Sequence, residues 1–332
     1  MRISSPTVVA ARHRVSAERQ TNFTQEFAAA SGEVSFTVPD GVFYISAVCV
    51  GGGGGASATS ITNQESGAGG AGGGLHYGTF PVTPGETLLI QAGTGGAGAA
   101  YTGLGATSSG GFGLNSHIKR GSRFILRASG GDGGYTPNNL VQGENGTAAV
   151  CANSGVTDPK YDYYSEASYN GGDGGWSVYN HSGGGGGGAA GYSGNGGNGG
   201  YYNPSSASVV AAQSGSVGGG GGAGAINSFP AALTTISPLP LGGGVGVLGE
   251  GSNGAGGSFG TSGSTIYSFG RPGSATPTTD ASAGGTAWGG GGNGPEDDAA
   301  QDGLDGLDGR VRVIFGTTNG AQPSRIYPNN AT

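Results

Sequence analysis

The chain has 332 residues, of which 80 are glycine and only 10% are charged, and its net charge at pH 7 is −7. The acidic balance argues against nucleic acid as the main partner, and no apolar run approaches the roughly 20 residues that a transmembrane helix needs. A glycine-rich composition without a collagen period is typical of low-complexity chains, but disordered segments usually carry dense charge, which this chain lacks. We therefore expect an ordered architecture built on glycine.

The distribution of glycine divides the chain into three parts. Residues 1–31 are poor in glycine and too few to bury a core, so we expect an N-terminal arm that docks on a neighbouring subunit or folds back on the body. Residues 32–316 form the glycine-rich body, and residues 317–332 form a C-terminal tail. The candidate attachment residues of the arm are Arg2, Arg12, Arg14 and Arg19.

Strand patterns stand at both ends of the body. Apolar residues alternate along 34–38 and 42–50, and the Pro39-Asp40-Gly41 stretch between them suits a type I turn. Pro84-Gly85 suits a type II turn, because glycine accepts the positive φ that this turn requires. The alternating segment "GRVRVIFG" at 309–316 is remote in sequence. We expect it to return and pair with the opening strands, which would close the ends of the body in a small β-sandwich.

Between these ends, glycine recurs with a period of three and no helical period is evident. The clearest runs are "GAGGAGGG" at 67–74, "GNGGNGG" at 194–200 and "GLDGLDG" at 303–309. A polyproline II helix has three residues per turn, so such a run leaves one or two faces without side chains and open to close packing. The predicted fold class is all-β and irregular: a small antiparallel β-sandwich closing a glycine-rich bundle of polyproline II helices, with essentially no α-helix in the body.

Aromatic residues concentrate in the segments that connect the glycine runs. If the runs pack side by side, these segments form the tips of the bundle, and their aromatics either cover exposed backbone or bind a partner. The candidate binding residues are Tyr161, Tyr163, Tyr164, Tyr169, Trp176, Tyr179, His181, Tyr201 and Tyr202.

Four motifs together resemble one known family. They are "SFTVPDGVFYISAVCVGGGGG", "GGGLHYGTFPVTPGETLLIQAGTGGAG", "GGFGLNSHIKRGSRFILRASGGDGG" and the closing "DGRVRVIF". The chain resembles the glycine-rich, polyproline-II-packed tail-fibre proteins of bacteriophages, of the T-even-like adhesin type, over most of residues 32–316. A similar glycine-rich module also occurs in the extracellular part of anaplastic lymphoma kinase, so the module alone does not fix a function.

The resemblance implies a function that is not enzymatic. It implies a virion protein at a tail fibre or tail tip whose aromatic loops bind a host surface protein or glycan, and whose residues 1–31 contact other virion proteins. Nucleic-acid binding and membrane insertion are not expected, and homo-oligomerisation is left open. The alternatives are a decoration protein of the capsid or fibre and, third, a depolymerase acting on surface glycan.

Residue patterns for catalysis or for a cofactor are absent from the sequence: there is no P-loop, no zinc spacing and no nucleophile elbow. We expect no catalytic residue, no cofactor and no metal. We expect one acidic segment to form a solvated edge rather than a calcium site or a catalytic carboxylate pair. Its acidic residues are Glu296, Asp297, Asp298, Asp302, Asp305 and Asp308. Cys49 is expected to be buried, and a disulfide with Cys151 is left open. The cationic cluster Lys119, Arg120, Arg123 and Arg127 is expected to be a solvated strand face.

Overall fold

The computed structural model describes residues 22–30, 32–59, 66–102, 109–135, 166–176, 182–203, 208–216, 219–223, 226–227, 242–247, 253–257, 288–294 and 302–316. Within these residues it contains strands and extended segments but no helix, so none of them forms a helix that could cross a bilayer. The strands are β1 (Asn22–Ala28), β2 (Val34–Thr37), β3 (Tyr44–Val50), β4 (Leu75–Pro81), β5 (Thr87–Gln91), β6 (Ser116–Arg120), β7 (Arg123–Ala128), β8 (Glu166–Tyr169), β9 (Ser182–Gly183), β10 (Tyr201–Asn203), β11 (Ser208–Val210), β12 (Ile226–Asn227) and β13 (Arg310–Gly316).

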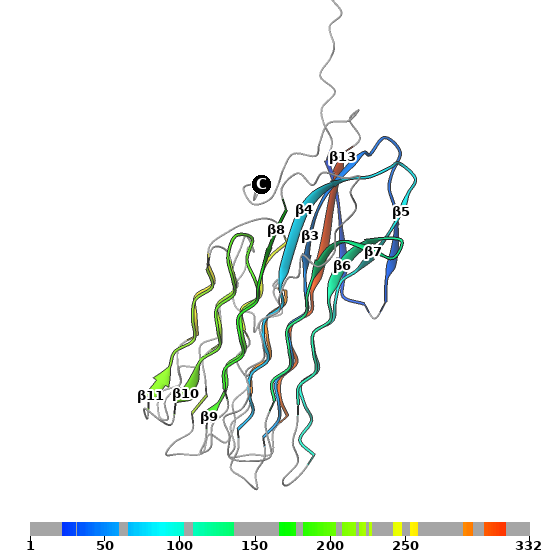
Figure 1. The fold of residues 1–332 in the computed structure, drawn as a ribbon. Helices are drawn as coiled ribbons and strands as arrows, with labels where there is room; N and C mark the ends of the chain where they lie inside the picture. The colour runs from blue at the N-terminus through cyan, green and yellow to red at the C-terminus, as the bar shows by residue number, and fades with distance from the viewer. Residues whose placement is uncertain are drawn as a thin grey trace, which may run out of the picture.

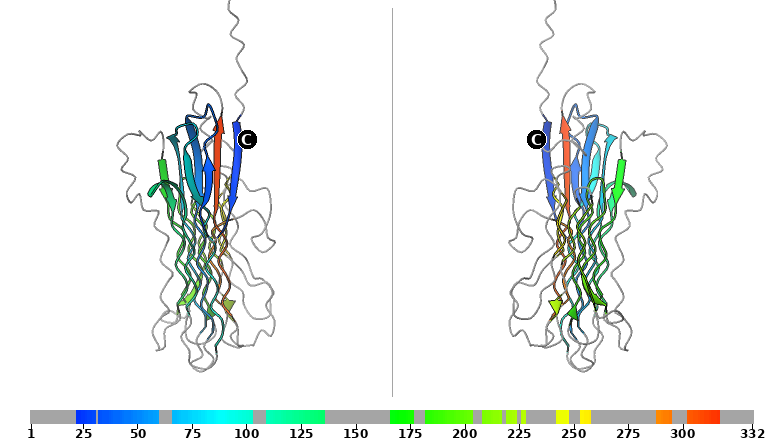
Figure 2. Two further views of the ribbon diagram at one scale, coloured as in Figure 1. Left: turned by 90° about the vertical axis from the view of Figure 1, so that its right-hand side faces the viewer. Right: turned by 90° about the vertical axis from the view of Figure 1, so that its left-hand side faces the viewer.

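Two antiparallel sheets form a sandwich at one end of an elongated molecule (Figures 1 and 2). The five-stranded sheet has the order β1-β13-β3-β4-β8, and the four-stranded sheet has the order β2-β5-β6-β7. Strand β13 pairs with β3 from Arg310 opposite Val50 to Phe315 opposite Ile45. The return of the last strand to the opening strands is therefore confirmed, as is the all-β fold class.

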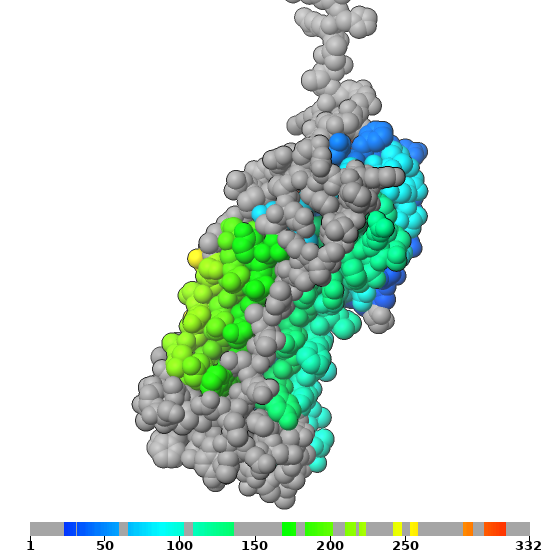
Figure 3. Space-filling model, viewed as in Figure 1, coloured from blue at the N-terminus to red at the C-terminus, as the bar shows by residue number. Residues whose placement is uncertain are grey.

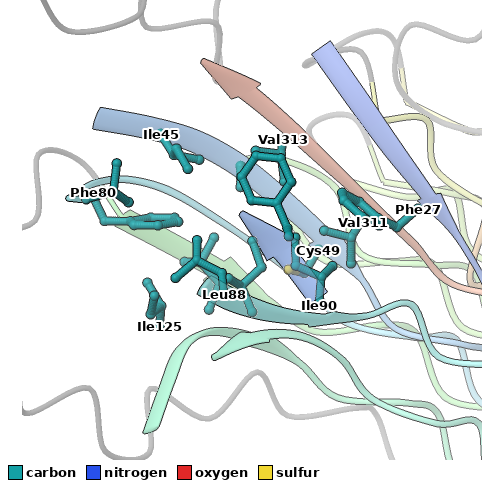
Figure 4. Close-up of a cluster of buried hydrophobic side chains, with 14 of the residues drawn as sticks. Phe27, Ile45, Cys49, Phe80, Leu88, Ile90, Ile125, Val311 and Val313 are labelled. Carbon is teal, nitrogen blue, oxygen red and sulfur yellow. The ribbon is translucent and has the colours of Figure 1, made fainter. Parts of the chain in front are cut away.

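The core of the sandwich consists of the inward-facing residues of both sheets (Figure 4). Ile45, Leu88 and Val313 are completely buried there, and Cys49 is buried beside them as the sequence predicted. Cys151 lies outside the described residues. Because each strand alternates its side chains between the two faces, the period of two in the sequence becomes this single apolar layer.

The two turns predicted at proline and glycine both exist, but one differs in type. Gly85 has a φ of 79°, and the N–H of Glu86 donates to the carbonyl oxygen of Thr83, as a type II turn requires. Gly41 has a φ of 77°, and the N–H of Val42 donates to the carbonyl oxygen of Pro39. The prediction of a type I turn was wrong because glycine occupies the third turn position, where its positive φ favours type II.

Below the sandwich, glycine-rich segments run side by side along the long axis (Figure 1), and we call each such segment a rod. Several rods continue sandwich strands directly: rod 51–59 follows β3, rod 93–101 follows β5, and rod 302–309 leads into β13. The rods in the described residues are 51–59, 66–74, 93–101, 109–115, 129–135, 170–176, 184–192, 194–200, 211–216, 219–223, 242–247, 253–257, 288–294 and 302–309.

Backbone hydrogen bonds join the rods in a hexagonal arrangement around rod 51–59. Three successive N–H groups of this rod, those of Gly51, Gly52 and Gly53, donate to three different neighbours, and the cycle repeats from Gly54. The acceptor rods are 66–74, 109–115 and 302–309. The rods that donate back to it are 93–101, 129–135 and 288–294. Three bonding directions in three residues are those of a polyproline II helix, and the N–H groups of residues 51–57 all pair with neighbouring rods.

Rod 184–192 is a second centre of the same kind. Its backbone N–H groups donate to rods 66–74, 194–200 and 242–247. It accepts from rods 170–176, 219–223 and 288–294. The two centres share rods 66–74 and 288–294 as neighbours, so the two hexagonal units are fused along one side. Rods 211–216 and 253–257 lie outside these units and bond to rod 219–223.

A second apolar cluster joins the bundle to the sandwich. Tyr192, at the sandwich end of its rod, is fully buried and packs on Tyr77 of β4 with ring centroids 5.6 Å apart. Its hydroxyl donates to the carbonyl oxygen of Gly246 at 3.1 Å. This single large side chain thus links a strand and two rods.

The sheet begins earlier than the boundary expected at residue 32. Strand β1 occupies Asn22–Ala28, and its Phe27 is buried in the sandwich core while Glu26 pairs with Arg310 at 2.9 Å. The segment assigned to the arm therefore contributes an edge strand to the body. Residues 1–21 and the tail 317–332 lie outside the described residues.

Candidate functional site

The end of the bundle opposite the sandwich brings two of the predicted aromatic residues together. Rod 170–176 ends at Trp176, and rod 194–200 ends where Tyr201 begins β10. The two rings stack with their centroids 5.5 Å apart and an interplanar angle of 19°. Both side chains are half-buried, so the stacked pair covers the last turn of the rods and still presents ring surface outward.

Asparagine side chains fix the register of the two rods that carry this pair. The Oδ1 atom of Asn198 accepts the N–H of Asp173 at 2.9 Å, and the Oδ1 atom of Asn195 accepts the N–H of Asn170 at 3.1 Å. The asparagines lie three residues apart, as do the two N–H groups that they accept. The "GNGGNGG" period therefore aligns the two rods and, with them, Trp176 and Tyr201.

Two further tyrosines end rods that run in the same direction. Rod 93–101 is parallel to rod 51–59, because Gly96 and Ala99 donate in order to Gly53 and Ala56, and it ends at Tyr101. Tyr135 ends rod 129–135 and is 38% exposed. Sequence reasoning missed both residues because each stands alone, outside the aromatic-rich segments. The available signal was their position as the first large side chain after a glycine run.

Tyr169 lies apart from the other described candidates. It is the last residue of β8, pairs with Leu75 of β4, and packs half-buried against the cluster that contains Tyr192. That position is at the sandwich end of rod 170–176, whereas Trp176 is at the other end.

The remaining candidates are placed only in part or not at all. For Tyr202 only the backbone is described, which pairs with Val209 in β10–β11. The other candidates lie outside the described residues: Tyr161, Tyr163, Tyr164, Tyr179, His181, Arg2, Arg12, Arg14 and Arg19.

The described part of the acidic segment has a structural role. The Oδ1 atoms of Asp302, Asp305 and Asp308 accept backbone N–H groups of the neighbouring rod, those of Tyr101, Gly98 and Gly95, at 2.6, 2.6 and 2.9 Å. The carboxylates are exposed, as expected of an acidic edge, but each also bonds to one backbone donor. No group of three metal-ligating side chains occurs among the described residues. Glu296, Asp297 and Asp298 lie outside them.

Most of the cationic cluster is engaged within the sandwich. Lys119 pairs with Glu33 at 2.5 Å, and Arg120 pairs with Glu86 at 3.0 Å. Lys119 and Arg127 also lie over the ring of Phe124, at 4.7 and 5.1 Å from its centroid. The cluster is thus a solvent-side face of β6 and β7 held together by ion pairs and by one aromatic ring.

One histidine beside this cluster is almost fully buried. The Nε2 atom of His117 is 2.9 Å from Glu33, and its side chain is 7% exposed. Because the carboxylate can only accept, the neutral ring donates from Nε2, which leaves Nδ1 as a buried acceptor with no partner among the described residues. Burial lowers the pKa of His117, since a second proton on Nδ1 would be desolvated. Hydrogen bonds from Lys119 and His117 lower the pKa of Glu33.

No curated protein is significantly similar to the chain. The model of one protein family, described as a glycine-rich domain, matches residues 28–316. The match begins at the last residue of β1 and ends with β13, so it covers the other described strands and all the described rods. The chain belongs to this glycine-rich domain family.

Proposed function

We propose that the chain is a structural protein of a bacteriophage virion, a tail-fibre or tail-tip adhesin that binds a host surface receptor and catalyses no reaction. The observation that supports this proposal is the meeting of Trp176 and Tyr201 where two rods end, at the far end from the sandwich. Aromatic rings on a rigid base give contact area with little loss of side-chain entropy, which suits a protein or a sugar surface.

The polarity of the molecule also supports this function. The sandwich is tied together by a conventional apolar core, and the rods extend from it as a backbone-bonded shaft (Figure 2). In the proposed particle, the sandwich end and residues 1–31 contact other virion proteins, and the rod ends face the host cell.

Immunogold labelling of intact phage particles with antibodies raised against the purified protein tests the location. We expect gold at the fibre or tail tip. Gold over the head would favour a decoration protein of the capsid, and particles without label, despite a strong signal on the isolated protein, would contradict a virion role.

Paired alanine variants test which end binds. We expect the double variant Trp176→Ala/Tyr201→Ala to lose binding to cells of the bacterial host that the particles adsorb to. The matched control is Phe43→Ala, which removes an aromatic residue 44% exposed at the sandwich end. Loss of binding in the control but not in the double variant would contradict receptor binding at the rod ends. Release of soluble sugar from host glycan by the wild-type protein would favour the depolymerase.

A further inference from the structure

On one side of the bundle, a set of backbone donors has no partner among the described residues. In rod 93–101, the N–H groups of Gly96 and Ala99 donate to the central rod 51–59, and those of Gly95, Gly98 and Tyr101 donate to aspartates. The third set consists of the N–H groups of Thr94, Ala97 and Ala100. Within the described residues none of these three makes a hydrogen bond.

The central rod shows where this third set points. Around rod 51–59 each of the three N–H sets reaches its own neighbouring rod, so a set without a partner faces a position that no rod of the described residues occupies. That position lies beside rod 109–115, because the N–H groups of Gly111 and Leu114 donate to the carbonyl oxygens of Ala97 and Thr94. Along three residues of polyproline II the spacing of such donors is about 9 Å.

Gly111 borders the same position and is less tightly enclosed than the other glycines of its rod. A Cβ atom added to Gly110 or Gly113 would overlap the carbonyl oxygen of a central-rod glycine, whereas one added to Gly111 would meet no atom closer than the backbone nitrogen of Ala97 at 3.0 Å. Leu114 follows Gly111 by three residues and therefore lies on the same face of its rod. We call the space bounded by Thr94, Ala97, Ala100, Gly111 and Leu114 the open slot.

The walls of the open slot are apolar and exposed. Leu114 is 43% exposed, and the small side chains of Ala97 and Ala100 on the neighbouring rod are exposed as well. The residues of these rods, coloured cyan to blue-green, reach the surface along the right-hand side of the space-filling view (Figure 3). Apolar side chains beside unpaired donors are the usual composition of a binding groove.

We infer that the open slot binds a polyproline II segment of a partner protein, with glycine at every third position and proline at others. Glycine is required where the segment's backbone meets rods 93–101 and 109–115, as it is between the rods themselves. The segment's carbonyl oxygens accept the N–H groups of Thr94, Ala97 and Ala100. Proline fixes the extended conformation before binding, so less entropy is lost, and its ring packs on Leu114.

Replacement of Ala97 by proline separates binding from folding. The N–H of Ala97 bonds to nothing in the described structure, and proline suits a polyproline II backbone, so Ala97→Pro removes one donor and fills the slot without breaking a bond between rods. The contrasting variant is Ala99→Pro, which removes the buried bond from Ala99 to Ala56 and is expected to unfold the bundle.

The experiment is a calorimetric titration of the full chain with the peptide acetyl-(Pro-Pro-Gly)3-amide. We expect saturable binding by the wild-type protein and binding at least about tenfold weaker by Ala97→Pro at an unchanged melting temperature, whereas a glycine-serine peptide of equal length should bind neither. Equal binding of the proline-glycine peptide by both proteins, or no binding at millimolar concentration, would overturn the inference. Self-association of the wild-type protein that Ala97→Pro abolishes would also overturn it, since the slot would then join copies of the chain.

Discussion

A methyl group has opposite consequences at two glycines of this bundle. At Gly70 a Cβ atom would overlap the carbonyl oxygen of Gly54, which belongs to a rod that cannot move away because six neighbours surround it. At Gly111 the nearest atom would be 3.0 Å away, on the side of the open slot. The cost of a side chain is therefore set by the occupancy of the adjacent position in the bundle, and a glycine run contains both kinds of residue.

We expect Gly70→Ala to lower the free energy of unfolding by more than about 3 kcal/mol, because backbone must shift to make room. Gly111→Ala should change it by less than about 1 kcal/mol, since only a small displacement of Ala97 is needed. Urea denaturation of both variants checks the difference. Equal destabilisation by the two substitutions would show that glycine is needed for backbone freedom rather than for space.

Each aspartate of rod 302–309 accepts one backbone hydrogen bond from the neighbouring rod, so its contribution can be tested singly. Asp305→Ala removes the acceptor for the N–H of Gly98 and should lower the free energy of unfolding by about 0.5–1.5 kcal/mol. Asp305→Asn keeps an Oδ1 acceptor and should change it by less than about 0.5 kcal/mol. Denaturation in the presence and absence of a calcium chelator completes the comparison, and we expect the chelator to change neither midpoint. A wild-type midpoint that falls with chelator and an alanine variant that does not respond would assign Asp305 to a metal site.

At the scale of the element, Glu33 fastens the connection between β1 and β2 to the face of β6 through His117 and Lys119. Burial holds the pKa of His117 below its ordinary value of 6.5. As the pH falls through 6.5, the unfolded chain therefore takes up a proton at His117 before the folded chain does, and the folded state loses stability. The pKa of Glu33 is below 4.5, so the stability that its carboxylate contributes is lost when the pH falls below that value. Acid therefore weakens this fastening in two steps, first through His117 and then through Glu33.

We expect the melting temperature of the wild-type protein to fall between pH 7.5 and pH 5.5, and His117→Gln to reduce the size of that fall. Glutamine can donate to Glu33 from its amide but does not titrate, so it keeps the hydrogen bond and removes the pH dependence. Calorimetric scans at several pH values measure both slopes. An unchanged slope in the variant would mean that His117 is not the group that titrates.

The elements differ in how far the sequence predicts them. The period of two indicates β2, β3 and β13 correctly, because each of these strands contributes apolar residues to the core of the sandwich. Strand β1 was missed because only Phe27 of its two phenylalanines is buried, while Phe23 is 45% exposed. The period of three predicts the rods, but glycine has no side chain to specify a neighbour.

The sequence therefore indicates which rods are neighbours only at the few polar side chains that form hydrogen bonds from one rod to the next. Asp302, Asp305 and Asp308 match three donors at the same spacing in rod 93–101, and Asn195 and Asn198 match two in rod 170–176. Such pairs are recognisable once the partner rod is known, but the period alone fits several partners. The candidate site was predictable to the same degree: Trp176 and Tyr201 were singled out, but their stacking depends on which rods are neighbours.

At the scale of the whole molecule, several segments of the chain run without a break from the sandwich into the bundle. Rods 51–59, 93–101 and 302–309 are continuous with core strands, and rods 66–74 and 288–294 bond to both hexagonal centres. Isolated polyproline II segments have no internal hydrogen bonds, so a rod is stable only while its neighbours are in place. Loss of one central rod removes partners from six others, which makes partial unfolding of the bundle costly.

We therefore expect one cooperative unfolding transition. The chain has two tryptophans at separated places: Trp288 packs on the cluster that joins the sandwich to the bundle, and Trp176 lies where the rods end. In Trp176→Phe the fluorescence reports the junction, and in Trp288→Phe it reports the far end. Each variant is followed by fluorescence and by circular dichroism during urea denaturation, so that each fluorescence midpoint is compared with the global midpoint of the same protein. Coincident midpoints in both variants are expected from the shared rods. A far-end transition at lower urea than the global one would show that the far end of the bundle unfolds separately from the junction.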